Sequence, residues 1–198
     1  MYFSLMRITW IVGLVATALF GMSSCQSRPA YIGEIRALDS LFFAVTDAER
    51  RFDEIQQEST SEFFGSIKDD LEFIQQSYEG TMDRDRAALL ADYRSITKLV
   101  KDFDRRYTRT NAEIDRTKNQ LRTLQNALES GATHDSEGGE MTAEYVAKVY
   151  KQETEVASNL IVEIDKMRDR IQLAQERYRE LHPDVMPILD SLYKSVNP

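Results

Sequence analysis

The sequence predicts an all-α protein, built as a small helical bundle from which a long antiparallel coiled-coil hairpin of two helices extends. Only 8 Gly and 4 Pro occur in 198 residues, and these helix breakers gather at a few points. The segments between them are rich in Leu, Ala, Glu, Arg, Lys and Gln, which favour helices. Apolar residues recur at spacings of three and four, and no segment alternates as a strand does.

The N-terminal segment combines a basic residue, an apolar stretch and a cysteine. Arg7 precedes 15 apolar or small residues, Ile8–Met22, and Ser23-Ser24-Cys25 follows. This order resembles a bacterial lipoprotein signal peptide, which implies that residues 1–24 are removed and that Cys25 carries the lipid. An uncleaved membrane anchor and a plain secretory signal are the alternatives, although the stretch is shorter than the ~20 residues of a spanning helix.

The residues after Cys25 bear on the destination. Gln26 is not the aspartate that retains lipoproteins in the inner membrane of well-studied Gram-negative bacteria. The acidic run that sends some lipoproteins to the cell surface is also missing from residues 26–29. The resemblance therefore implies a lipid-anchored protein of the cell envelope, in the outer membrane and facing the periplasm. Residues 25–31 would form the lipidated tether, and residues 32–198 a single helical domain.

Two helices are expected first, over residues 32–57 and 61–79. Ser59 with Glu62 three residues later resembles a capping box, which satisfies free amide groups at a helix start. Their apolar stripes predict an antiparallel pair with its turn at Ser59-Thr60. The pairs expected to meet are Ile55 with Phe64, Phe52 with Ile67, Ala48 with Leu71, and Val45 with Ile74.

A longer pair of helices is expected over residues 82–129 and 141–181, joined by a polar loop at 130–140. The stripe of the first follows the seam of a left-handed coiled coil. Residues equidistant from a point near 137 should meet, as in Phe103 with Ile171. The pairs that carry this register also include Leu128 with Tyr145, Leu121 with Gln152, Ile114 with Leu160, and Tyr93 with Leu181.

The expected lengths set the expected shape. The 32–57 and 61–79 pair covers only the lower part of the longer pair, so the upper part should be a bare hairpin. Since the first helix would start at the base, the hairpin should point away from the membrane. A last short helix over 184–196 is expected to fold against the base through Ile188, Leu189, Leu192 and Tyr193.

The loop at the hairpin tip is the candidate partner-binding site, through Thr133, His134, Asp135 and Glu137. Loops held on rigid scaffolds often carry function. Together with Glu140 these side chains could touch a cation, but their spacing fits no EF-hand and one histidine makes a poor zinc site. A solvated loop is the preferred interpretation, and no metal or cofactor is expected.

Polar residues interrupt the apolar seam at Thr110 and Thr117, and at Gln152 on the partner helix. These positions could form a polar site between helices, but small or polar core residues that fix register are the preferred interpretation.

The tripeptide His182-Pro183-Asp184 matches the signature of J-domain co-chaperones, and the preceding Arg177–Leu181 resembles the helix before their loop. The chain ends 14 residues after Asp184, too soon for the helix that a J-domain needs next. A helix that stops at Pro183, with Asp184 capping the next one, is the preferred interpretation.

Composition excludes several classes of function. The chain carries 25 Lys and Arg against 33 Asp and Glu, which argues against nucleic acid. Two histidines, no free thiol once Cys25 is lipidated, and no Gly-rich phosphate loop leave little support for an enzyme. The single cysteine has no partner for a disulfide within the chain.

The whole mature chain resembles the helical, coiled-coil lipoproteins of unknown function common in Bacteroidota. The resemblance lies in Leu90-Ala91-Asp92-Tyr93-Arg94-Ser95-Ile96 leading into Val100-Lys101-Asp102-Phe103, and in Glu180-Leu181-His182-Pro183. It brings no activity with it. A looser likeness in shape is to helical lipoproteins of Gram-positive bacteria thought to bind the cell wall.

The leading hypothesis is therefore a non-enzymatic, lipid-anchored interaction or scaffold protein that presents the hairpin to a protein or cell-wall partner. The alternative is a periplasmic chaperone or carrier that holds apolar clients between its helices. The doubled aromatics Phe42-Phe43 and Phe63-Phe64 favour that alternative. The exposed seam also leaves oligomerisation through the hairpin open.

Overall fold

The fold is all-α, as the sequence predicts. The computed structural model describes residues 30–135 and 138–196, and within them it holds five helices and no strand. These helices are α1 (Ile32–Asp53), α2 (Gln57–Ser77), α3 (Arg84–Leu99), α4 (Phe103–Ser130) and α5 (Ala143–Val196). The expected lipidation site Cys25, the expected signal peptide and most of the expected tether lie outside the described residues.

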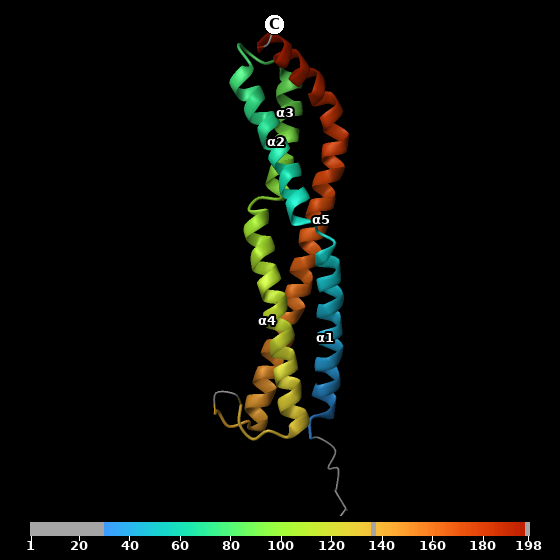
Figure 1. The fold of residues 1–198 in the computed structure, drawn as a ribbon, viewed down its shortest axis with the longest axis vertical. Helices are drawn as coiled ribbons and strands as arrows, with labels where there is room; N and C mark the ends of the chain where they lie inside the picture. The colour runs from blue at the N-terminus through green and yellow to red at the C-terminus, as the bar shows by residue number, and fades with distance from the viewer. Residues whose placement is uncertain (1–29, 136–137, 197–198) are drawn as a thin grey trace, which may run out of the picture.

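The helices form a long bundle of three parallel columns (Figure 1). Helix α5, with 54 residues, is one column by itself and follows a path of ~80 Å. The second column consists of α1 followed by α2, and the third of α3 followed by α4. Helix α1 packs on α4 and α5, whereas α2 packs mainly on α3 and α5.

The antiparallel pairing expected between the first two helices is wrong. Helices α1 and α2 make no contact with each other and follow one another along α5 (Figure 1). The chain breaks for three residues only, Glu54 to Gln56. Ser59 does not begin a helix, because it lies in the first turn of α2, where its hydroxyl donates to the Gln56 carbonyl. The apolar stripe of α5 needs cover along its whole length, and only the end-to-end arrangement supplies it.

The expected continuous helix over 82–129 is also divided. It begins as predicted, since Asp83 caps α3 by accepting hydrogen bonds from the amides of Asp85 and Arg86. It then breaks between Leu99 and Phe103, where Asp102 adopts the left-handed conformation at φ 59°. Aspartate is among the few residues that tolerate this conformation.

The last helix does not stop at Pro183. Helix α5 continues through Pro183 and Pro187 to Val196, so no separate helix exists over 184–196. Proline removes an intrahelical hydrogen bond and kinks a helix, and α5 curves across the ends of α2 and α3 in this region (Figure 1). The expected packing of Ile188 and Leu189 is present, and Tyr193 stacks on Phe73 of α2.

Of the pairs expected for the longer helices, Phe103 with Ile171 fits the structure and Leu121 with Gln152 does not, because Gln152 is exposed. Phe103 and Ile171 line the same small cavity, and the Met141 amide donates to the Thr133 carbonyl. The hairpin is not bare, because α1 lies along it. On α5 the buried positions near the loop are Val146 and Ala157, and the expected seam residues Gln152 and Val156 are exposed.

The position of α1 reverses the expected orientation. Helix α1 begins at Ile32 beside the 131–142 loop (Figure 1) and is joined to α4 there by the Asp39–Arg122 ion pair. The chain therefore enters the bundle at the loop end, and the α2–α3 end is distant from it. Within the described residues, no helix has the length and apolarity that crossing a membrane requires.

Candidate functional site

The loop at the end of α4 is held by backbone hydrogen bonds. Gly131 ends the helix at φ 63°, and the amides of Gly131 and Ala132 donate to the carbonyls of Leu128 and Ala127. This is the Schellman arrangement, in which glycine satisfies the last carbonyls of a helix. His134 and Glu140 then face each other in a single β-bridge. The loop is thus a small closed turn.

The predicted tip residues do not play equal parts in this loop. Thr133 and His134 are exposed, with the Thr133 hydroxyl 3.0 Å from His134 Nδ1. Asp135 is half-buried: its carboxylate accepts from the Gly139 amide at 2.7 Å and from the Tyr145 hydroxyl at 2.6 Å. Glu137 lies outside the described residues. Asp135 therefore fastens the loop to α5, whereas the predicted tip residues Thr133 and His134 present their side chains to solvent.

A groove of about 410 Å³, here termed the loop-end groove, lies between α4 and α5 next to this turn. Asp135 and Met141 close its lower end, and Tyr145, Val149 and Glu153 line its α5 side. Its α4 side consists of Asn119, Gln120, Thr123, Leu124 and Ala127. The groove combines apolar, amide and carboxylate groups, which suits a peptide or a sugar chain.

Glu153 lines this groove from α5, and its carboxylate lies in a perturbed electrostatic environment. One of its carboxylate oxygens is buried and makes no hydrogen bond. Burial raises the pKa of Glu153, Arg116 partly offsets that effect, and the negative charge of Glu113 adds to it. The groove is therefore lined by a half-buried carboxylate whose charged form is disfavoured by burial.

Sequence reasoning missed Glu153 because it followed the wrong face of α5. The expected stripe passed from Val149 to Gln152 and Val156, whereas the buried face passes through Glu153 to Ala157. The signal was available, since Val146, Val149, Glu153 and Ala157 also repeat at three and four, but a charged residue in that series argued against it.

The polar interruptions of the seam behave as core residues. Thr110 and Thr117 are both buried on α4. The Thr117 hydroxyl makes no hydrogen bond, and neither residue lines the loop-end groove. Their small size allows close approach of the helices, in line with the register interpretation, and they form no polar site with the exposed Gln152.

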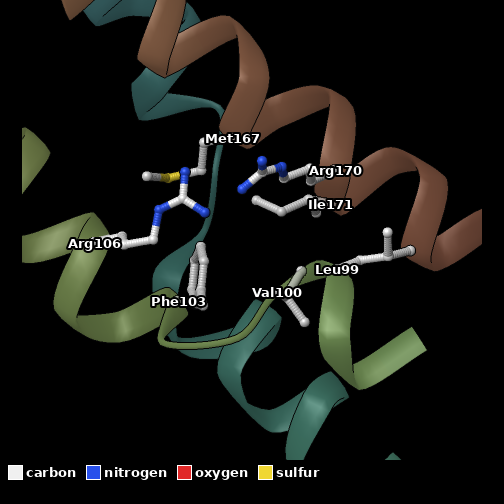
Figure 2. A pocket seen from close by; sticks show the side chains of 7 residues that line it. All are labelled: Leu99, Val100, Phe103, Arg106, Met167, Arg170 and Ile171. Carbon is white, nitrogen blue, oxygen red and sulfur yellow. The ribbon is translucent and has the colours of Figure 1, made fainter. Parts of the chain in front are cut away.

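The two broken columns are interrupted at the same level, here termed the waist. It consists of Glu54–Gln56, Val100–Asp102 and the facing turn of α5 at Arg168–Ile171. Figure 2 shows Phe103 and Arg106 of α4 facing Met167 and Ile171 of α5 across a cavity of about 10 Å³. That volume holds about one water molecule, so the cavity is a packing gap and not a ligand site.

Ion pairs fix the columns around the waist. Arg106 pairs with Glu163, and Arg51 pairs with Asp165 at 3.1 Å. Both carboxylates belong to α5. The α1–α2 column and the α3–α4 column are therefore each joined to α5 by an ion pair close to the waist.

His182 lies in a polar network inside the α2–α3–α5 half. The fully buried Tyr93 places its hydroxyl 2.8 Å from Asp70 Oδ2 and 3.1 Å from His182 Nδ1. Burial and the Asp70 carboxylate together raise the pKa of Tyr93. The ring of Tyr178 stacks on His182 at 4.4 Å. His182-Pro183-Asp184 therefore lies within a helix, and the histidine joins three helices together.

Of the two adjacent phenylalanine pairs, Phe42-Phe43 and Phe63-Phe64, three side chains pack against other residues of the bundle. Phe64 contacts Phe103, and Phe63 packs against Tyr178. The Arg122 guanidinium lies over Phe42, with its carbon 3.8 Å from the centroid of the ring. Phe43 is the exception, at 62% exposed.

Metal ligands do not gather in the part of the chain that the structure describes, because no three His, Cys, Asp or Glu side chains converge there. Comparison of the chain with protein-family models, with curated proteins and with solved structures gives no match.

Proposed function

We propose that this chain is a non-enzymatic, lipid-anchored interaction protein of the periplasm, with its loop end close to the membrane. The observation that carries this proposal is the position of α1. It begins at Ile32, seven residues after Cys25, at the same end of the bundle as the loop. Seven extended residues span at most ~25 Å. A lipid on Cys25 would therefore hold the loop end within that distance of the bilayer.

The continuous helix supports a role as a spacer or scaffold. Two of the three columns are interrupted at the waist, whereas α5 passes it without a break. The ion pairs of Arg51 and Arg106 with α5 attach the interrupted columns to it. An anchored bundle of this form would hold its α2–α3 half tens of ångströms from the membrane, on the order of the ~80 Å path of α5.

The loop and the loop-end groove are the surfaces that we propose for a membrane-proximal partner, either a protein or a cell-wall polymer. Thr133 and His134 are exposed at the turn, and Glu137 belongs to the same loop. Glu153 places a carboxylate on the α5 side of the groove. Hydrogen-bond donors such as amides or sugar hydroxyls of a partner would pair with its accessible part.

The anchoring is tested by replacing Cys25 with alanine in a cell that processes lipoproteins. The wild-type chain should incorporate an alkyne-tagged palmitate and sediment with membranes. Cys25→Ala should incorporate none and lose its membrane association. A matched Ser24→Ala variant should behave as wild type. Membrane association that survives Cys25→Ala would identify an uncleaved anchor and would contradict the proposal.

The partner surface is tested by photocrosslinking from the loop. A photoreactive residue at Thr133 should give crosslinked species in intact cells, and one at the exposed Asp190, in the opposite half of the bundle, should not give the same species. Glu153→Gln should reduce the yield from Thr133 if the groove contributes. Identical products from Thr133 and Asp190 would contradict recognition at the loop end.

A further inference from the structure

Basic side chains gather along one groove of the distant half. Two adjoining hollows of about 530 and 440 Å³ share Lys68 and Thr97, and together they form what is here termed the α2–α3 groove. The basic residues lining it are Lys68, Arg94, Lys98, Lys101 and Arg105. Arg94 and Lys98 are one turn apart on α3, Lys101 lies in the break between α3 and α4, and Arg105 is on α4, so the two hollows and not one helical face bring these four together.

These cations are left unused by the fold. Within residues 30–135 and 138–196, Lys68, Arg94, Lys98 and Lys101 form no ion pair, and only Arg105 does so, with Asp102. By contrast, Arg51, Arg106, Lys118 and Arg122 each pair with a carboxylate on another helix. The net charge of the chain is −8, so the groove is basic although the chain as a whole is acidic.

The carboxylates that line the groove are already engaged. Asp102 pairs with Arg105, Asp104 accepts from Ser61 and Gln57, and Glu72 accepts from Gln76. Four unpaired cations and the Arg105–Asp102 pair therefore share the groove with Asp104 and Glu72, which accept hydrogen bonds from neutral side chains. An incoming anionic group would meet donors that are free to pair with it.

The bottom of the groove is apolar. Phe64, Val100 and Phe103 line the larger hollow and Leu71 lines the smaller one, each at most 9% exposed, so they form a narrow apolar floor. A purely anionic polymer would leave this floor uncovered, and a purely apolar segment would leave the lysines unpaired. A helix with an apolar stripe and acidic flanks satisfies both requirements, and a groove between two helices is the shape in which amphipathic helices dock.

We propose that the α2–α3 groove binds an acidic amphipathic helix of a partner protein. The inference deepens the proposed interaction role by giving the chemistry of one partner, and it rests on that role. On an anchored chain, the groove would lie in the half held away from the membrane. Its cations would steer the acidic helix and pair with it, and its apolar residues would bury the helix stripe.

The test is a selection from displayed helices of about 20 residues, long enough to span the groove. Apolar positions are fixed at heptad spacing, and the remaining positions vary among Glu, Lys, Ser and Ala. Selection on the purified chain, with residues 1–25 removed, should enrich Glu at the positions flanking the stripe. Binding of the enriched helices should weaken as salt rises.

The matched variants decide whether the groove is responsible. Lys68→Glu, Lys98→Glu and Lys101→Glu combined should weaken binding of the enriched helices by about tenfold or more, because like charges would face each other. Lys148→Glu, Lys151→Glu and Lys166→Glu combined change the same number of exposed lysines on α5 and should have little effect. Circular dichroism checks that both triple variants remain helical.

Three results would overturn the inference. The first is enrichment without acidic bias, and the second is equal binding to both triple variants. The third is binding of polyphosphate or anionic vesicles through the same lysines while no displayed helix binds, which would assign the groove to a polyanion. Each of these results leaves palmitate labelling of Cys25 and crosslinking from Thr133 unaffected, so the two proposals fail separately.

Discussion

The ring of Phe52 in α1 stacks on the ring of Tyr107 in α4, with centroids 4.5 Å apart. Phe52 is fully buried there, and it has no contact with Ile67, the α2 residue that the antiparallel pairing assigned to it. This stacking shows what α1 does in the fold: it covers the α4–α5 pair and leaves α2 to cover α3 and α5.

Phe52→Ala should therefore destabilise the whole bundle. Removing a fully buried aromatic side chain typically costs ~3–5 kcal/mol of the free energy of unfolding. Phe43→Ala, which removes the same side chain from an exposed site on the same helix, should change that free energy by no more than about 0.5 kcal/mol. Urea denaturation followed by circular dichroism measures both, and similar losses for the two variants would contradict the position of α1.

The helical nature of both long segments could be predicted from the sequence, but the course of α1 and α2 and the inward face of α5 between Val149 and Ala157 could not. Two stripes spaced at three and four give matching pairs when counted outward from any turn between them. The agreement of Ile55 with Phe64 and Val45 with Ile74 therefore did not distinguish a hairpin from two helices in line. The distinguishing fact is the apolar stripe of α5, which runs from Val146 to Leu189 and needs cover over ~65 Å.

The site was predicted only in part. Thr133 and His134 are on the surface of the loop, as expected from its polarity. The anchoring role of Asp135 depends on Tyr145, ten residues away, and could not be read from spacing. The path of α5 through Pro183 was missed because local rules favour a helix end before proline, whereas burial of Val185 and Ile188 favours continuation.

Gly131 and Gly65 should respond in opposite directions to alanine. Gly131 has φ 63° at the end of α4, so Gly131→Ala should cost about 1 kcal/mol of unfolding free energy. Gly65 lies inside α2, and an added Cβ would meet nothing within 4 Å. Gly65→Ala should therefore stabilise the chain by about 0.5–1 kcal/mol. Thermal unfolding of the two variants checks this, and a stabilising Gly131→Ala would contradict the loop geometry.

Tyr93→Phe should lower the free energy of unfolding. It should also reduce the loss of that free energy as the pH rises above 10. Loss of the hydroxyl leaves Asp70 and His182 without their shared partner, at a cost of about 1–3 kcal/mol. The folded pKa of Tyr93 is raised above the ordinary value of 10.0, mainly by burial. Its contribution is therefore complete below pH 10 and declines as the pH rises above that value.

The measurement is the urea midpoint between pH 8 and pH 11. Wild type should lose more stability across this range than Tyr93→Phe does. Tyr193→Phe, at a half-exposed tyrosine, serves as the control and should follow wild type. Parallel curves for wild type and Tyr93→Phe would show that Tyr93 does not ionise in the way its burial requires.

Glu153→Gln should stabilise the chain at neutral pH. Because burial raises the folded pKa of Glu153 above 4.5, its ionisation weakens the folded state as the pH rises through that region. Solvent screening limits the gain from the amide to about 0.5 kcal/mol at pH 7, and it should disappear near pH 4. Glu155→Gln, at an exposed position on the same helix, should show no such difference between pH 4 and pH 7.

The end-to-end arrangement of α1 and α2 is tested most directly by a distance between spin labels at Arg36 and Gln76, both exposed, in a Cys25→Ser background. Two helices in line place these positions about 60 Å apart. A helical hairpin turning at Ser59-Thr60 would place them ~15 Å apart. Double electron–electron resonance should give a distribution centred on the long distance, and a dominant peak at the short one would contradict the three-column bundle and the orientation drawn from it.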